Sequence, residues 1–299
     1  MESLRDIRTN IKSIRATRQI MLTMKMIAVA RVKKSQETIE SARPFAAKMQ
    51  QMMGTLKTEL AQQDDAITQS WVRWICEPRA EKEYVGLILI TADKGLCGAF
   101  NTNVLRACAD WLRENRDRKI RAFCVGKKGR DFLRRIKGLD LAIVHESVGI
   151  FPKVSFADAE LLGQALVDKF NSAKLSSVTA IYTEYKSMLT QTMKKREFLP
   201  LSAEEAPEQS RYREDFLFEP DKRAIFESLV PRYVKSQVYR MMLESQAAEL
   251  AARMNAMESA SNNASDIIDA LTLKLNRTRQ ASITTELTEI VSGAEALKS

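Results

Sequence analysis

The sequence predicts an α/β protein: the two chain ends form a long antiparallel coiled coil, and the middle forms a small Rossmann-like α/β domain. Apolar residues recur every three or four positions at both ends, and glycine and proline are largely absent there. Strand-like runs alternate with helical segments in between. The expected segments are 1–60 for the N-terminal helix, 80–220 for the α/β domain and 221–299 for the C-terminal helix.

The N-terminal segment has the pattern of a coiled-coil helix. From Met1 to Arg43 there is neither glycine nor proline, and a repeat near 3.5 residues is the sign of a left-handed coiled coil. The apolar positions are Leu4, Ile7, Ile11, Ile14, Met21, Ala28, Val32 and Ile39, with Arg18, Lys25 and Ser35 in slots where apolar residues would be expected. We expect Pro44 to bend the helix, which then continues to about residue 60.

The C-terminal segment gives the stronger coiled-coil pattern, because no glycine or proline occurs from Arg232 to Ser292. One heptad frame passes through Leu243, Ala247, Leu250, Met254, Met257, Ser261, Ala264, Ile268, Leu271, Leu275, Thr278 and Ser282. At ~1.5 Å per residue this helix would be about 90 Å long, whereas a domain of this size is roughly 30–40 Å across. We therefore expect both helices to project beyond the domain and to pair with each other.

The middle of the chain alternates between strand-like and helical patterns. The expected strands are 85–91, 120–126 and 141–147, the expected helices are 102–115, 127–136 and 155–173, and a closing hairpin is expected over 178–187 and 190–201. Such alternation predicts an α/β layer with parallel strands. A polar loop is expected over 202–215, before the last helix.

The glycines of the middle segment do not form a nucleotide-binding motif. Gly95 and Gly98 lack the GxGxxG spacing, Gly126 and Gly129 in GKKG do not make a phosphate loop, and GxxxxGK[ST] is absent from the sequence. The simpler interpretation is a solvated turn whose glycines adopt left-handed geometry. We expect no cofactor in this domain, so a nucleotide-dependent enzyme is disfavoured.

No set of residues predicts catalysis or metal binding. The four cysteines, which are Cys76, Cys97, Cys108 and Cys124, show no CxxC spacing and are expected to be buried reduced thiols. His145 is the only histidine, which disfavours a metal site or a histidine-dependent triad. The carboxylate pairs Asp266/Asp269 and Glu286/Glu289 are expected on solvated helix faces.

The positive charge predicts an acidic partner. The formal net charge is +9, and residues 1–34 hold nine Lys or Arg against Glu2 and Asp6. Such an arm suits nucleic acid, a lipid surface or an acidic protein loop. Residues 1–44 contain no aromatic side chain on which a base could stack, so an acidic protein is favoured. A coiled-coil nucleic-acid-binding protein remains the alternative.

Neither secretion nor a membrane span is expected. The longest apolar stretch runs from Tyr84 to Ile90, far short of the roughly 20 residues that a helix needs to cross a bilayer. The N-terminus carries charges throughout and lacks the apolar core of a signal peptide. The chain is expected to stay on the side of the membrane where it is made.

Three strings resemble one family: SLRDIRTNIKSIRATRQI with MKMIAVARVKKSQ, the loop TADKGLCGAFNTNV, and PRYVKSQVYR with ESQAAELAARMNAMESASNNASDIIDALTLKLNRTRQASITTELTEIVSGAEAL. Over essentially the whole chain the sequence resembles the γ subunits of F-type ATP synthases, in the bacterial form without the chloroplast cysteine insertion. The resemblance implies a rotor shaft inside a hexamer of α and β subunits, standing on a ring of c subunits together with ε. It also implies that catalysis belongs to β, and that the chain lies peripherally at the cytoplasmic face of the bacterial inner membrane.

The resemblance also implies site residues. Met24, Lys25, Arg253, Arg279, Gln280 and Thr284 match positions that contact β, and Phe216 and Glu219 match the foot on the c ring. Lys25 departs from the family pattern, which has Glu there and Lys-Ala in place of Leu22-Thr23. The expected consequence is a stronger attraction to acidic loops of β. The C-terminal string ELTEIVSGAEALKS resembles the tip that turns in an apolar sleeve.

Overall fold

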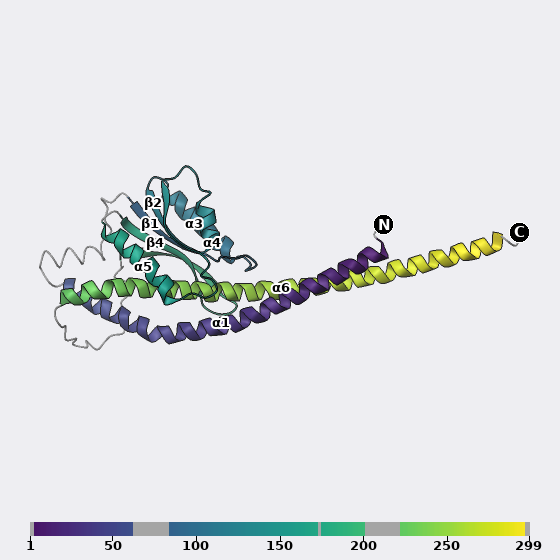
Figure 1. Cartoon of the computed structure of the whole chain (residues 1–299), viewed down its shortest axis with the longest axis horizontal. Helices are drawn as coiled ribbons and strands as arrows, with labels where there is room; N and C mark the ends of the chain where they lie inside the picture. Colours follow the sequence, from purple (N-terminus) through teal and green to yellow (C-terminus); the bar gives the residue numbers. More distant parts are fainter. Residues whose placement is uncertain (1–2, 62–83, 173–174, 201–221, 297–299) are drawn as a thin grey trace. The chain divides into compact units, whose positions relative to one another are not determined.

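The computed structural model describes residues 3–61, 84–172, 175–200 and 222–296. Its contacts divide the chain into two units: Met1–Val29 with Arg253–Ser299, here called the coiled-coil unit, and Ala30–Ala252, here called the α/β unit. Two long helices, α1 (Leu4–Ala61) and α6 (Lys222–Ala296), contribute to both units (Figure 1). The expected α/β fold class with long terminal helices is confirmed.

The α/β unit contains one five-stranded sheet with the strand order β3-β2-β1-β4-β5. The strands are β1 (Tyr84–Ile90), β2 (Lys119–Val125), β3 (Leu141–Ser147), β4 (Leu175–Tyr185) and β5 (Gln191–Leu199). The first four are parallel, and β5 pairs antiparallel with β4. The expected closing hairpin is therefore confirmed.

Helices cover both faces of this sheet, as Figure 1 shows. They are α3 (Phe100–Glu114), α4 (Lys127–Leu133) and α5 (Phe156–Asn171). Side chains alternate along β1, so Leu87 and Leu89 pack with residues of α3 and α4, whereas Ile88 and Ile90 pack with residues of α5, α6 and α1. Burial on both faces explains why β1 is continuously apolar.

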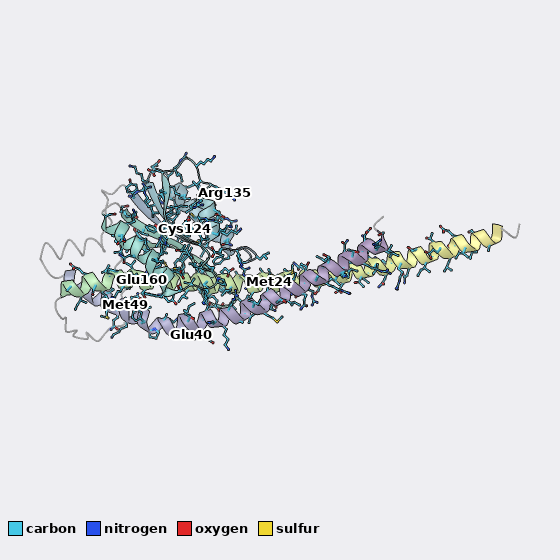
Figure 2. The ribbon with its side chains drawn as sticks, in the orientation of Figure 1. Met24, Glu40, Met49, Cys124, Arg135 and Glu160 are labelled. Atoms are coloured by element: carbon cyan, nitrogen blue, oxygen red, sulfur yellow. The ribbon has the colours of Figure 1, made fainter. Side chains whose placement is uncertain are left out.

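The segments of α1 and α6 in the α/β unit run antiparallel. Val32 of α1 packs with Leu250, and Met49 and Met53 belong to the same buried cluster as Met241 and Met242. Figure 2 places Met49 between the two helices and Glu40 on the exposed side of α1. Residues 241–250 of α6 are all buried, which makes this stretch a core helix rather than one side of a two-helix seam.

The coiled-coil unit is held by one apolar seam. Ile7 and Ile11 are buried against Ile268, and Ile14, Leu271 and Leu275 pack on this cluster. Farther along α1, Lys25 lies 2.7 Å from Glu258, which precedes Ile268 on α6, so the pairing is antiparallel. Burying one isoleucine side chain stabilises by about 1.5–3 kcal/mol. The heptad frame read from the sequence is confirmed, because Met254, Met257, Ser261, Ala264 and Ile268 are all buried.

Candidate partner-binding surfaces

A row of cations lies exposed along α1 in the coiled-coil unit. It consists of Arg5, Arg8, Lys12, Arg15 and Arg18. Spacings of three and four residues place neighbouring members on one side of the helix. None of the five is in an ion pair within the described part of the chain. This basic row is therefore a surface on which an acidic partner can bind.

Three of the sequence-predicted contacts, Met24, Lys25 and Arg253, are partly buried in the coiled-coil unit. Lys25 is already engaged within the chain, because its Nζ lies 2.7 Å from Glu258 Oε1 across the helix pair. Its charge is thus partly neutralised before any partner binds. This weakens the expectation that Lys25 strongly attracts acidic loops of another subunit.

The pair of Lys25 and Glu258 predicts a small, reciprocal effect on stability. Lys25→Glu alone should destabilise the coiled-coil unit, because two carboxylates would then face each other. Adding Glu258→Lys should restore most of the loss, with a coupling energy of about 0.2–1 kcal/mol. Urea unfolding of the two single variants and the double variant measures it. A double variant no more stable than the sum of the single effects would contradict this pairing.

The C-terminal end of α6 is exposed on all sides. Arg279, Gln280 and Thr284 are exposed, and so are the apolar side chains of Ile283, Leu287, Ile290 and Val291. The threonine hydroxyls bond within the helix, for example Thr284 Oγ1 to the carbonyl of Gln280 at 2.9 Å. From Ile283 on, this end therefore presents apolar groups and few free hydrogen-bond donors, as an apolar sleeve would require.

Removing this end should leave the chain as stable as before. The described side chains that a variant ending at Thr278 loses are exposed, apart from the partly buried Ser282, so its unfolding temperature should change by less than about 2 °C. Circular dichroism melting of both chains measures it, and the helical signal should fall in proportion to the residues removed. A drop of about 5 °C or more would show that this end packs on the rest of the chain.

The remaining two predicted contacts are those assigned to the c ring. Phe216 and Glu219 lie outside the described residues, as does the polar loop expected over 202–215. Their assignment to the c ring stays a prediction.

The carboxyl edge of the parallel strands is where α/β sheets commonly bind nucleotides, and here it holds a side chain of the protein. Asp93 Oδ1 accepts hydrogen bonds from the backbone N–H groups of Lys127 and Gly149, both at 2.9 Å, and Oδ2 accepts one from Phe151 at 3.1 Å. The carboxylate therefore occupies one donor at the start of α4 and two donors in the segment after β3, which an anion could otherwise use.

The glycines near this edge serve close packing. Gly129 lies against Thr91, whose Oγ1 accepts a hydrogen bond from Gly129 N at 2.8 Å. Gly126 has a φ of +90°, a backbone geometry that favours glycine. Both glycines of GKKG thus let the start of α4 approach the end of β1. The interpretation of Gly95 and Gly98 as turn glycines is partly confirmed, since Gly98 has a φ of +56° and Leu96, between them, has a φ of +62°.

The cysteines of the described residues are buried. Cys97, Cys108 and Cys124 form no disulfide, and Figure 2 shows Cys124 inside the α/β layer. Burial raises the pKa of both Cys108 and Cys124 to about 12, so neither forms the reactive thiolate at neutral pH. The expectation of buried reduced thiols is confirmed for these three. Cys76 lies outside the described residues.

A buried acid on α6 was missed by sequence reasoning. Glu244 is 7% exposed, and its Oε1 accepts a hydrogen bond from Arg240 Nε at 2.8 Å. Burial raises the pKa of Glu244, with Glu184 adding to the rise and Arg240 and Arg196 opposing it. Tyr182, whose pKa is raised to about 12, also faces Glu244. The local sequence shows only Arg240 beside this glutamate, because Tyr182 and Glu184 come from the distant strand β4.

This raised pKa predicts a pH dependence with a definite sign. Ionised Glu244 is less favourable in the folded than in the unfolded chain, so wild-type stability falls as pH rises from the unfolded value of about 4.3 through the folded value. Glu244→Gln removes that loss. The glutamine variant should therefore gain stability relative to wild type as the pH rises above about 4.3, as urea unfolding would measure. The exposed variant Glu40→Gln is the control, and an equal gain there would contradict the assignment.

Within the part of the chain that the structure describes, no three or more His, Cys, Asp or Glu side chains gather in a way that could hold a metal ion. No helix there is both long and apolar enough to cross a membrane. What the described residues do present is a helical pair with a basic row, and a single-helix end with apolar side chains. These surfaces are typical of a subunit that works by contact with other chains.

Comparison with known proteins agrees with this class. A family model described as ATP synthase matches residues 3–297. The ATP synthase gamma chain of Elusimicrobium minutum (strain Pei191) is 46% identical, covering 99% of each chain. That of Prosthecochloris aestuarii (strain DSM 271 / SK 413) is 38% identical, covering 100% of this chain and 99% of the relative. The chain belongs to the ATP synthase γ-chain family, and the nucleic-acid-binding alternative finds no support.

Solved structures agree with this assignment. A chain of the central stalk and c ring of Tetrahymena thermophila mitochondrial ATP synthase is 28% identical, with a TM-score of 0.59 over 81% of this chain and 99% of that chain. A chain of the Euglena gracilis mitochondrial ATP synthase assembly of OSCP, F1 and c ring is 21% identical, with a TM-score of 0.66 over 98% and 94%. The second match shows the shared fold.

Proposed function

We propose that this chain is the central rotor shaft of an F-type ATP synthase. It couples rotation of the c ring, driven by ion flow, to conformational cycling of the β subunits during ATP synthesis or hydrolysis. The observation that carries the proposal is the 46% identity to a γ chain over 99% of both sequences. The chain is a non-catalytic subunit, and the chemistry of ATP takes place on other subunits.

The coiled-coil unit suits this role, because its two helices present different surfaces. The basic row runs along α1, whereas α6 continues beyond its partner and exposes Ile283, Leu287 and Ile290. An asymmetric shaft contacts each surrounding β subunit differently and so favours a different conformation in each. Rotation then moves each β subunit through the same sequence of states.

The partners follow from this role. The shaft contacts the hexamer of α and β subunits, the ε subunit and the c ring, and reaches the membrane only through that ring, at the cytoplasmic face of a bacterial inner membrane. The contacts with β are assigned to Met24, Lys25, Arg253, Arg279, Gln280 and Thr284, and those with the c ring to Phe216 and Glu219. In this division of the chain, the helices of 1–60 and 221–299 form the shaft, and the domain of 80–220 holds the foot on the c ring.

Reconstitution tests the proposal. The cognate α and β subunits are mixed with and without this chain, assembly is followed by size exclusion, and ATP hydrolysis is measured. One chain should enter each hexamer, and sustained hydrolysis should rise at least about tenfold, equal to about 1.4 kcal/mol in activation free energy. Failure to assemble, with retention of nucleic acid at physiological salt instead, would overturn it.

A further inference from the structure

A cavity of about 850 Å³ opens within the α/β unit. Its walls come from residues 39–50 of α1, residues 236–244 of α6, the first residue of α5 and the end of β4. All of these residues belong to Ala30–Ala252. The volume falls within the roughly 300–1,000 Å³ of sites that bind small organic molecules. None of the contact residues assigned above lies in it.

The floor and one wall of this cavity are apolar. Leu243 is buried, and the rings of Phe156 and Tyr239 meet edge to face with centroids 5.5 Å apart. Phe45 contributes a second aromatic side chain that is 62% exposed. An exposed aromatic ring beside a packed aromatic pair offers apolar surface that a ligand can remove from water.

The charged groups of the cavity are not balanced. The carboxylate of Glu244 is bonded to Arg240 at 2.8 Å, and that of Glu184 lies 3.5 Å from Lys194 Nζ. Two cations that also line the cavity, Arg43 and Lys186, are exposed. Within the described residues, neither of these two side chains has an acidic partner. The accessible charge around the apolar walls is therefore positive.

We propose that this cavity binds a small amphipathic anion, with an apolar chain or ring system along Phe45, Tyr239 and Leu243 and a single carboxylate on Arg43 and Lys186. The exposed cations favour this anionic ligand over a cationic one. Glu184 Oε2, which lies 3.5 Å from Lys194 Nζ, and Glu244 Oε2 are both buried, so a ligand entering from solvent meets the exposed cations rather than these carboxylate oxygens. The site is independent of the proposed rotor role, since it uses none of the residues assigned to other subunits.

Calorimetric titration of the full chain with dodecanoate, below its micelle concentration, tests the proposal. Dodecylammonium is the matched probe, because it has the same apolar chain and the opposite charge. Dodecanoate should bind one per chain and at least about tenfold more tightly than dodecylammonium. Equal binding of the two probes, or no binding of dodecanoate, would overturn the charge assignment and the proposal with it.

Two variants locate the site. Arg43→Glu combined with Lys186→Glu should weaken dodecanoate binding at least about tenfold, whereas Lys34→Glu, an exposed cation on α1 outside the cavity, should leave it unchanged. Ala46→Trp should weaken binding by filling the space between the helices. Circular dichroism checks that each variant folds; if Ala46→Trp does not, the double charge variant decides alone. Dodecanoate binding that none of these changes alters would show a non-specific surface effect and overturn the proposal.

Discussion

Replacing Gly126 by alanine should cost the α/β unit about 3–5 kcal/mol of folding free energy. A Cβ atom at this position would lie 2.0 Å from the carbonyl oxygen of Thr91 and 2.7 Å from its carbonyl carbon. Both are backbone atoms at the end of β1, which cannot move without disturbing the sheet. The φ of +90° adds strain of its own. Urea unfolding of the variant measures the loss.

Gly138→Ala separates the two causes. Gly138 has a similar φ of +81°, but a Cβ there would meet nothing within 4 Å. The backbone strain alone should cost about 1–2 kcal/mol, so the difference between the two variants reports the steric overlap at Thr91. Equal losses in the two variants would contradict the close approach of α4 to β1.

Replacing Ile11 by aspartate should separate the two helices of the coiled-coil unit. Ile11 is 6% exposed and lies in the seam with Ile7 and Ile268. The substitution removes an apolar side chain and buries an unpaired carboxylate, at a cost of about 3 kcal/mol or more. We expect less helical circular dichroism and faster tryptic cleavage at the exposed arginines of α1. In a reconstituted complex, stimulation of ATP hydrolysis should be lost.

Thr9→Asp is the matched control for this variant. Thr9 is exposed on the same helix, so the substitution adds the same charge without burying it. Its helical signal should stay close to wild type. If Ile11→Asp behaves like Thr9→Asp, the seam does not hold the unit together.

The periodic features of this fold could be predicted from the sequence. From Met254 to Ile268 the heptad frame coincides with the buried positions of α6, because the spacing of apolar residues decides which side of a helix can be buried. The three parallel strands expected in the middle and the closing hairpin were predicted for a similar reason. A continuous apolar run between polar loops can be buried in few ways other than as a strand covered on both faces.

The features that were missed depend on contacts between distant segments. Asp93 bonds backbone groups more than 30 residues away, and neither its type nor its neighbours indicate this. Gln246 is another example: its Nε2 donates to Ser35 Oγ at 2.8 Å and its Oε1 accepts from Val154 N at 2.7 Å. The heptad pattern predicts that this part of α6 packs against one other helix only. The sheet and α5 cover its other sides, so polar residues there are buried as well.

Direct observation of rotation tests the central claim. A hexamer of α and β subunits containing this chain is fixed to a surface. A gold particle is then attached to a single cysteine introduced by Lys137→Cys, because Lys137 is exposed on the α/β unit. The buried Cys97, Cys108 and Cys124 should not react, and Cys76 is replaced by serine. We predict stepwise rotation in one direction when ATP is added and none without it. Steady ATP hydrolysis by an assembled complex whose particle does not turn would contradict the rotor assignment.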